Sequence, residues 1–159
     1  MTNLLMETLK FCKGIDPVAD AFDNAVIPAS DVYNMEGYEK ILFMIYIGVG
    51  ATGTQTWTVE ACDDVVPTNV TAIPFWHREI LTTDVEGTLT RDAAAGFTVT
   101  AGSSKIILVE AHADELPSNR AYIRLVQSAE PVNSPCLGGV MAMLGGARYA
   151  SLTKPTVLT

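Results

Sequence analysis

The hydrophobic pattern of the chain is that of short strands separated by turns. Between residues 31 and 149, apolar runs recur at regular spacing, and clusters of Gly, Pro, Asn and Asp interrupt them. Short strands bounded by such turn residues are typical of an antiparallel β-sandwich. The sequence therefore predicts an all-β sandwich, most simply a jelly roll of about eight strands.

Two runs show how the strands should be buried. Residues 55–62 alternate strictly, so that Trp57, Val59 and Ala61 share one side of a half-buried strand. Residues 38–47 contain ILFMIYI, which is apolar on both sides and typical of a central strand covered on both faces. Further strands are predicted at 31–35, 72–81, 97–100, 106–109, 121–126 and 136–149.

Residues 105–126 have the clearest strand–turn–strand pattern. A β-branched run at 106–109 is followed by DELPSN, in which Pro117 and Asn119 favour a turn. The alternating segment 121–126 follows, and we expect these two strands to pair in one antiparallel sheet. Pro74, inside the predicted strand 72–81, indicates an edge strand or a bulge.

Residues 1–29 differ from the strand pattern. Leu5, Leu9 and Cys12 have helical spacing, which predicts a short amphipathic helix over 3–13 that ends at Gly14. The irregular segment 15–29 fits either an arm along a neighbouring subunit or an arm folded back on its own domain. The predicted division of the chain is an arm at 1–29, a sandwich domain at 30–149 and a C-terminal tail at 150–159.

Composition limits the functional classes. The 159 residues are 48% apolar and 18% charged, with a formal net charge of −8. A mean hydropathy of +0.25 favours some apolar surface that contacts a partner. The acidic charge, with basic residues scattered singly, argues against a nucleic-acid partner. Neither a signal peptide nor an apolar run of the ~20 residues that cross a membrane is seen, so we expect synthesis in the cytoplasm and no membrane partner.

The chain carries few candidates for chemistry. His77 and His112 are its two histidines, and neither has a second ligand at a recognisable metal spacing. His77 is expected to be packed or exposed rather than catalytic. His112 should lie on the same side of a strand as Glu110 and Asp114, because residues two apart share a face. We expect no enzyme activity and no cofactor.

Two further clusters have simple alternatives. Glu60, Asp63 and Asp64 resemble a hard-cation site in residue type, but they are not spaced like a calcium loop, which favours a solvated turn. A sugar-binding platform could be formed by aromatic residues, although core positions explain them equally well. The aromatic residues concerned are Trp57, Tyr122 and Tyr149.

The three cysteines, Cys12, Cys62 and Cys136, are too far apart for a C-x-x-C motif. Reduced, mostly buried thiols are the simplest expectation. Because their number is odd, an intermolecular disulfide through one of them is an alternative if the protein meets an oxidising environment.

Four stretches of the sequence, 31–48, 57–64 with 72–79, 109–125 and 138–149, carry a family likeness when they are taken in order. They resemble small tailed-phage and prophage virion proteins, the capsid cement or decoration proteins with a jelly-roll-like fold. The third, VEAHADELPSNRAYIRL, matches best, although His112 stands where the family usually has Asp. In the fourth, Ala147 and Ala150 replace the usual prolines.

The resemblance implies a structural role in the virion. A cement protein binds the outside of the phage head between capsomers, contacts the major capsid protein and sometimes other head proteins, and is commonly a homotrimer. It implies no catalytic residues. On this basis we expect the N-terminal arm to reach the capsid with Leu4, Leu5, Leu9 and Phe11 as apolar anchors. A tail or baseplate component and a carbohydrate-binding sandwich remain the alternatives.

Overall fold

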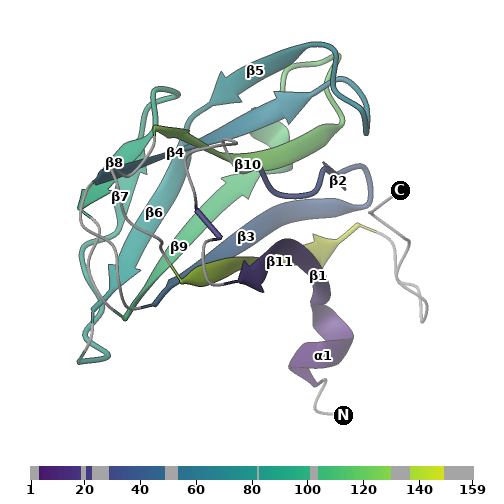
Figure 1. Ribbon diagram of the computed structural model, residues 1–159. Helices are drawn as coiled ribbons and strands as arrows, with labels where there is room; N and C mark the ends of the chain where they lie inside the picture. Colours follow the sequence, from purple (N-terminus) through teal and green to yellow (C-terminus); the bar gives the residue numbers. More distant parts are fainter. Residues whose placement is uncertain are drawn as a thin grey trace.

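The computed structural model describes residues 4–18, 21–22, 29–48, 54–81, 83–100, 104–129 and 137–148, which form two antiparallel sheets stacked face to face (Figure 1). This confirms the predicted all-β sandwich. The elements in chain order are α1 (Leu5–Thr8), β1 (Lys10–Val18), β2 (Tyr33–Asn34), β3 (Tyr38–Ile47), β4 (Thr54–Cys62), β5 (Val70–Ile73), β6 (Phe75–Ile80), β7 (Thr90–Asp92), β8 (Phe97–Thr100), β9 (Lys105–His112), the 3₁₀ turn η1 (Ala113–Glu115), β10 (Tyr122–Ala129) and β11 (Gly138–Ala147).

The strand order is that of a jelly roll with an insertion. One sheet has the order β1-β11-β3-β9-β6-β7, and the other has β2-β10-β4-β5 with β8 also paired to β4. In a jelly roll of eight strands, the first pairs with the eighth, the eighth with the third and the third with the sixth, while the second sheet runs second, seventh, fourth, fifth. Taking β1–β5 and β9–β11 as these eight strands reproduces both orders. β6, β7 and β8 are then an insertion. β6 and β7 widen the six-stranded sheet, and β8 pairs with the part of β4 that β5 does not reach.

The core lies between the sheets and is built by alternation along each strand. Ile41, Phe43 and Ile45 of β3 are fully buried, as are Trp57 and Val59 of β4 in the opposite sheet. Two edge-to-face aromatic contacts cross this interior, with ring centroids 5.7 Å apart for Tyr33 and Phe43 and 5.3 Å apart for Phe22 and Trp57. Burial of these large apolar side chains is the main stabilising contribution to the fold.

The predicted helix over 3–13 is wrong beyond Thr8. Residues 10–18 form β1, an edge strand paired with β11, so this segment is folded against its own domain. Gly14, which the sequence suggested as a helix stop, lies in this strand at the first of two breaks in register. A Cβ at Gly14 would be 2.7 Å from the carbonyl oxygen of Val140, so only glycine permits this approach to β11. The rest of the predicted arm and the tail at 150–159 lie largely outside the described residues.

Two predicted strand arrangements also differ from the structure. The strands β9 and β10 do not pair with each other, because η1 and the following turn carry the chain from one sheet to the other. The predicted strand 72–81 is divided at Pro74, with β5 in the five-stranded sheet and β6 in the six-stranded sheet. Proline has no N–H to donate to a ladder, so it marks the point where the chain changes sheets.

Candidate functional site: the apolar face of the six-stranded sheet

The outer side of the six-stranded sheet carries mostly apolar side chains, and we call it the apolar face. It consists of every second residue of five neighbouring strands. The residues between them along each strand point into the core. Its members are Phe11 and Lys13 of β1, Gly139, Met141, Met143 and Gly145 of β11, Lys40, Leu42, Met44 and Tyr46 of β3, Ile106, Leu108, Glu110 and His112 of β9, and Trp76, Arg78 and Ile80 of β6.

Register aligns these side chains into rows that cross the strands. Met141, Met44, Leu108 and Arg78 are consecutive cross-strand neighbours in the central row. Side chains at such positions lie about 5 Å apart, so they shield one another laterally. Side chains of the apolar face still reach solvent: Tyr46 is 51% exposed, and Met141 is 41% exposed. Leu89, from the connection between β6 and β7, borders the face at Trp76 and Leu108.

The outer side of the five-stranded sheet provides a comparison within the same molecule. Its corresponding positions on β4 are Thr56, Thr58 and Glu60, the alternates of Trp57 and Val59. Thr56 shares a hydrogen bond with Thr98 (2.8 Å), and Glu60 accepts hydrogen bonds from the guanidinium of Arg124. Hydroxyls and an ion pair are what a water-facing sheet is expected to present. The two sheets of one fold therefore differ in what they offer to solvent.

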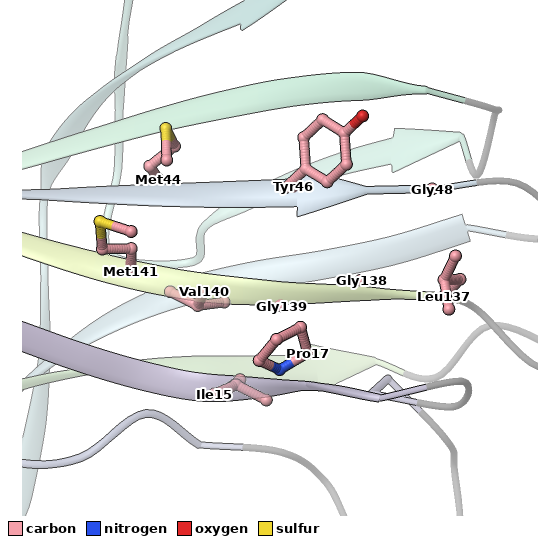
Figure 2. Close-up of a pocket in the computed structure, with 10 residues that line it drawn as sticks. All are labelled: Ile15, Pro17, Met44, Tyr46, Gly48, Leu137, Gly138, Gly139, Val140 and Met141. Carbon is pink, nitrogen blue, oxygen red and sulfur yellow. The ribbon is translucent and has the colours of Figure 1, made fainter.

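Among the hollows that the described residues form on the apolar face, two lie at opposite corners. The first, which we call the glycine hollow, has a volume of about 360 Å³, and none of the described residues that line it is charged. Figure 2 shows Met44, Tyr46 and Met141 standing on β3 and β11 above it, with Pro17 of β1 opposite. Gly139, on the outer side of β11 beside Tyr46, contributes no side chain, and this absence opens the space.

The second hollow lies over β3, β9 and β6, and we call it the Trp76 hollow. Its volume is about 350 Å³, and its apolar wall is made by Trp76, Leu42, Leu89 and Leu108. Arg78, Glu110 and His112 supply polar groups at its border. The guanidinium carbon of Arg91 lies 5.3 Å from the centre of the Trp76 ring and covers one side of it, at the distance of a cation–π contact.

The two histidines are where the sequence placed them. His77 packs flat against Phe97, with ring centroids 4.1 Å apart, and its Nδ1 shares a hydrogen bond with a carboxylate oxygen of Asp92. This confirms that His77 is a packed residue. Nε2 of His112 lies 3.0 Å from Oε1 of Glu110, as the shared strand face predicted. Asp114 lies in η1 and is exposed.

The acidic cluster at the end of β4 is a capped turn. The carboxylate of Asp63 accepts hydrogen bonds from the backbone N–H groups of Thr68 and Asn69 and from both of their side chains. These bonds, those from Asn69 most of all, hold the pKa of Asp63 well below its ordinary value. Asp64 accepts a hydrogen bond from the N–H of Val65. Among the described residues, no group of three or more metal-ligating side chains converges.

The proposed sugar platform does not form around Trp57. Its ring is fully buried between the sheets, whereas Tyr122 is half-buried on the outer side of the five-stranded sheet. Tyr149 lies outside the described residues. The expectation that these aromatic residues occupy core positions is therefore confirmed for Trp57. Trp76, 37% exposed, is the indole that faces outward.

Cys12 and Cys62 are buried free thiols, and Cys136 lies outside the described residues. Burial raises the pKa of both thiols, that of Cys62 to about 11. Neither sulfur is open to a partner chain in this arrangement, which leaves Cys136 as the residue through which the predicted intermolecular disulfide would have to form.

The expected anchor residues lie at one border of the apolar face. Leu4 and Leu5, at α1, are 62% and 74% exposed, Phe11 is 46% exposed on β1, and Leu9 is half-buried. Sequence reasoning identified this border but missed the face itself. The signal was present in ILFMIYI, whose two apolar sides were interpreted as two covered sides. One of them is covered by the second sheet, and the other is the apolar face.

No known family model matches the chain, and no curated protein matches its sequence. Among solved structures, the chain is similar in overall shape to the SPBc2 prophage-derived protein YomS, with a TM-score of 0.48 and 8% identity over 91% of this chain and 98% of that one. Similarity at this level assigns no family, and the jelly-roll topology stands on the strand pairing described above. No described helix is long and apolar enough to cross a membrane.

Proposed function

We propose that this protein is a structural component of a tailed-phage virion that binds other proteins through the apolar face. The observation that carries the proposal is the contrast between the two outer sheet surfaces. One presents threonines and an ion pair together with the exposed Val70, and the other presents Met44, Tyr46, Leu108, Met141 and Trp76. A sheet surface that is apolar without a covering layer is typical of a protein interface.

The size of the apolar face fits this role. Five strands at about 4.8 Å spacing and three rows of side chains at about 6.7 Å give an area of roughly 500 Å². Functional patches on soluble monomers are of about this size. A partner that covered the whole face would bury about 1,000 Å² in total, which is near the lower limit for a specific interface. Affinity on a virion would then come from many copies bound side by side.

The finer proposal is a capsid cement protein on the outer surface of the head. Its support is the family resemblance of the four sequence stretches, together with the jelly-roll order that the resemblance implied. The partners proposed are the major capsid protein and, in a homotrimer, further copies of this chain, with other head proteins as additional contacts. The role is mechanical, with no enzymatic reaction and no cofactor, nucleic-acid or membrane partner. A tail or baseplate component is the alternative, since the apolar face would serve it equally.

The exposed border of α1 adds to the binding surface. Leu4, Leu5 and Phe11 continue the apolar surface past the edge of β1, where a partner lying on the face would reach them. Charge favours a protein partner over a lipid or nucleic-acid surface, because the chain carries a net −8. The edges of the sandwich are less suited to binding: β1 is interrupted by two register breaks and Pro17, and β7 spans three residues.

Fractionation of phage particles tests the proposal. Particles from cells that produce the protein are separated into heads and tails, and the protein is measured in each fraction by mass spectrometry. A cement protein is expected in the heads. Its presence in tails alone would support the baseplate alternative, and its absence from both, with binding on a glycan array, would support a carbohydrate module.

A pair of variants connects the fractionation to the apolar face. Trp76→Ser removes a 37% exposed aromatic from the face, and Val70→Ser removes a 41% exposed apolar side chain from β5 of the other sheet. We expect Trp76→Ser to lower head occupancy at least tenfold and Val70→Ser to leave it unchanged. Equal occupancy for both folded variants would show that the apolar face is not the binding surface.

A further inference from the structure

The helix α1 presents apolar side chains to solvent and buries none of its residues. Leu4 and Leu5 are 62% and 74% exposed. The turn is held by local bonds: the backbone N–H of Leu4 donates to Oε2 of Glu7 (3.0 Å), and Oγ1 of Thr8 donates to the carbonyl of Leu5 (3.0 Å). Glu7 thus uses its charge to cap the turn. The result is a small apolar projection at the border of the sandwich (Figure 1).

The glycine hollow has the complementary shape. It is concave and uncharged along its described lining, and its volume of about 360 Å³ is more than twice the ~150 Å³ that holds a benzene ring in a protein interior. Gly139 keeps it open, because a Cβ there would lie 3.1 Å from atoms of Ile15 and Pro17. The space is sufficient for two aliphatic side chains such as Leu4 and Leu5.

These two features cannot meet within one molecule. α1 is joined to the start of β1 through Leu9 alone, whereas Ile15 and Pro17, which line the hollow, lie near the end of β1. At about 3.3 Å per residue, the length of β1 separates them by roughly 20 Å. β1 is paired with β11 along this length, so the projection is held at a fixed distance from its own hollow.

We propose that α1 of one copy binds in the glycine hollow of a second copy. The two surfaces are different parts of the chain, so the contact is heterologous, and repeating it gives a ring if the rotation between copies closes and an open filament if it does not. Leu4, Leu5 and the described lining of the hollow carry no charge, and the carboxylate of Glu7 in α1 is used in its bond to the N–H of Leu4. The Trp76 hollow, on the opposite corner of the apolar face, stays open to another virion protein. The inference rests on the homotrimer of the proposed function and assigns the contact that holds its copies together.

Sedimentation of the full-length chain, with two variants, tests the contact. Leu4→Ser/Leu5→Ser removes the projection, and Met141→Arg places a charge at the hollow. The wild-type chain is expected to assemble with increasing concentration. A ring of three copies would match the proposed trimer. Each variant is expected to weaken assembly at least 100-fold. Val66→Ser is the matched control, because Val66 is 75% exposed, like Leu5, but lies elsewhere.

Mixing the two variants gives the sharper result. The Leu4→Ser/Leu5→Ser variant keeps an intact hollow, and the Met141→Arg variant keeps an intact α1. Together the two variants can therefore form one intact contact. We expect a one-to-one complex that neither variant forms alone. A wild-type chain that stays monomeric, variants that assemble as the wild type does, or a mixture without complex would each overturn the proposal. If Met141→Arg fails to fold by circular dichroism, Tyr46→Ser replaces it. Head occupancy in the fractionation is read separately, so failure here leaves the proposed function standing.

Discussion

Two adjacent residues of β3 should respond to the same substitution in opposite ways. Ile45 is fully buried between the sheets, while Met44 points to the apolar face beside Met141 and Leu108. Replacing each by alanine removes a side chain of similar size from opposite sides of one strand. Ile45→Ala is expected to reduce stability, and Met44→Ala is expected to reduce assembly.

The magnitudes follow from burial. Ile45→Ala leaves a cavity in a packed core, which costs about 2–5 kcal/mol. For a chain of this size each kcal/mol lowers Tm by about 2–4 °C, so a decrease of roughly 5–15 °C is expected. Met44 has lateral neighbours but no covering layer among the described residues, so Met44→Ala should cost about 1 kcal/mol or less in the isolated chain.

Urea unfolding monitored by tryptophan fluorescence measures both effects, because Trp57 is buried in the core and Trp76 is partly exposed on the apolar face. The experiment is done at a protein concentration at which copies are dissociated, since assembly would itself stabilise the folded chain. A lower midpoint at unchanged slope reports a loss of stability. Assembly is then compared by sedimentation at higher concentration.

One outcome would refute the reasoning about the apolar face. If Met44→Ala lowers the free energy of unfolding of the dissociated chain as much as Ile45→Ala does, then Met44 is covered within its own molecule. The face would then be a second core layer and could not serve as a binding surface.

Three further predictions concern particular groups. Gly96→Ala should cost at least about 2 kcal/mol and lower Tm, because Gly96 has φ of +84° and a Cβ would lie 2.1 Å from the carbonyl oxygen of Trp57. The pKa of Asp63 is depressed in the folded state. The stability that its carboxylate contributes is therefore complete above the ordinary carboxyl pKa of about 3.9 and is lost as the pH falls below that value. Asp63→Asn should lower Tm at pH 7 and flatten the acid limb of a Tm–pH profile. Cys12 and Cys62 should resist alkylation at pH 8 in the native chain and react after unfolding, as measured by peptide mapping.

Matched variants and contrary results define these tests. Gly145→Ala is the control for Gly96, because its Cβ would meet side-chain atoms of Leu9 and Lys40 at 3.3 Å or more; an equal effect of both would contradict the backbone argument. Asp64→Asn is the control for Asp63, because it removes the charge of a carboxylate that accepts a hydrogen bond from the N–H of Val65 alone among the described residues. A parallel change in its acid limb would contradict the capping argument. Rapid native alkylation of Cys62 would show that β4 opens at its end.

Most of the strand positions could be predicted because alternation is a local signal. Residues 38–47 and 97–100 are strands at the predicted bounds, and residues 55–62 differ by one residue. The N-terminal segment was misjudged because Leu5, Leu9 and Cys12 also fit helical spacing. Its pairing with β11 is set by a strand at the far end of the chain, which no local pattern reports.

The apolar face could not be recognised from the sequence for a related reason. An apolar residue that faces a second sheet and one that faces a partner protein look the same in a linear pattern. Tyr46 and Met141 are separated from the core residues Ile45 and Val140 by a single position. To decide which side of a strand is covered, one must know how many layers of secondary structure the fold has. That number is a property of the whole fold.

The pairing of β1 with β11 has a consequence for the time at which the protein matures. The first strand of the jelly roll has its partner in the last, so the edge of the six-stranded sheet cannot close until synthesis reaches Gly138–Ala147. Pairing over such sequence separation is slow compared with local structure formation. Because β1 and β11 also form the glycine hollow and fix the position of α1, an incomplete chain has neither half of the proposed contact. Nascent chains on a polysome are therefore expected to remain separate, and a fragment ending before Gly138 should not enter the assemblies that full-length chains form.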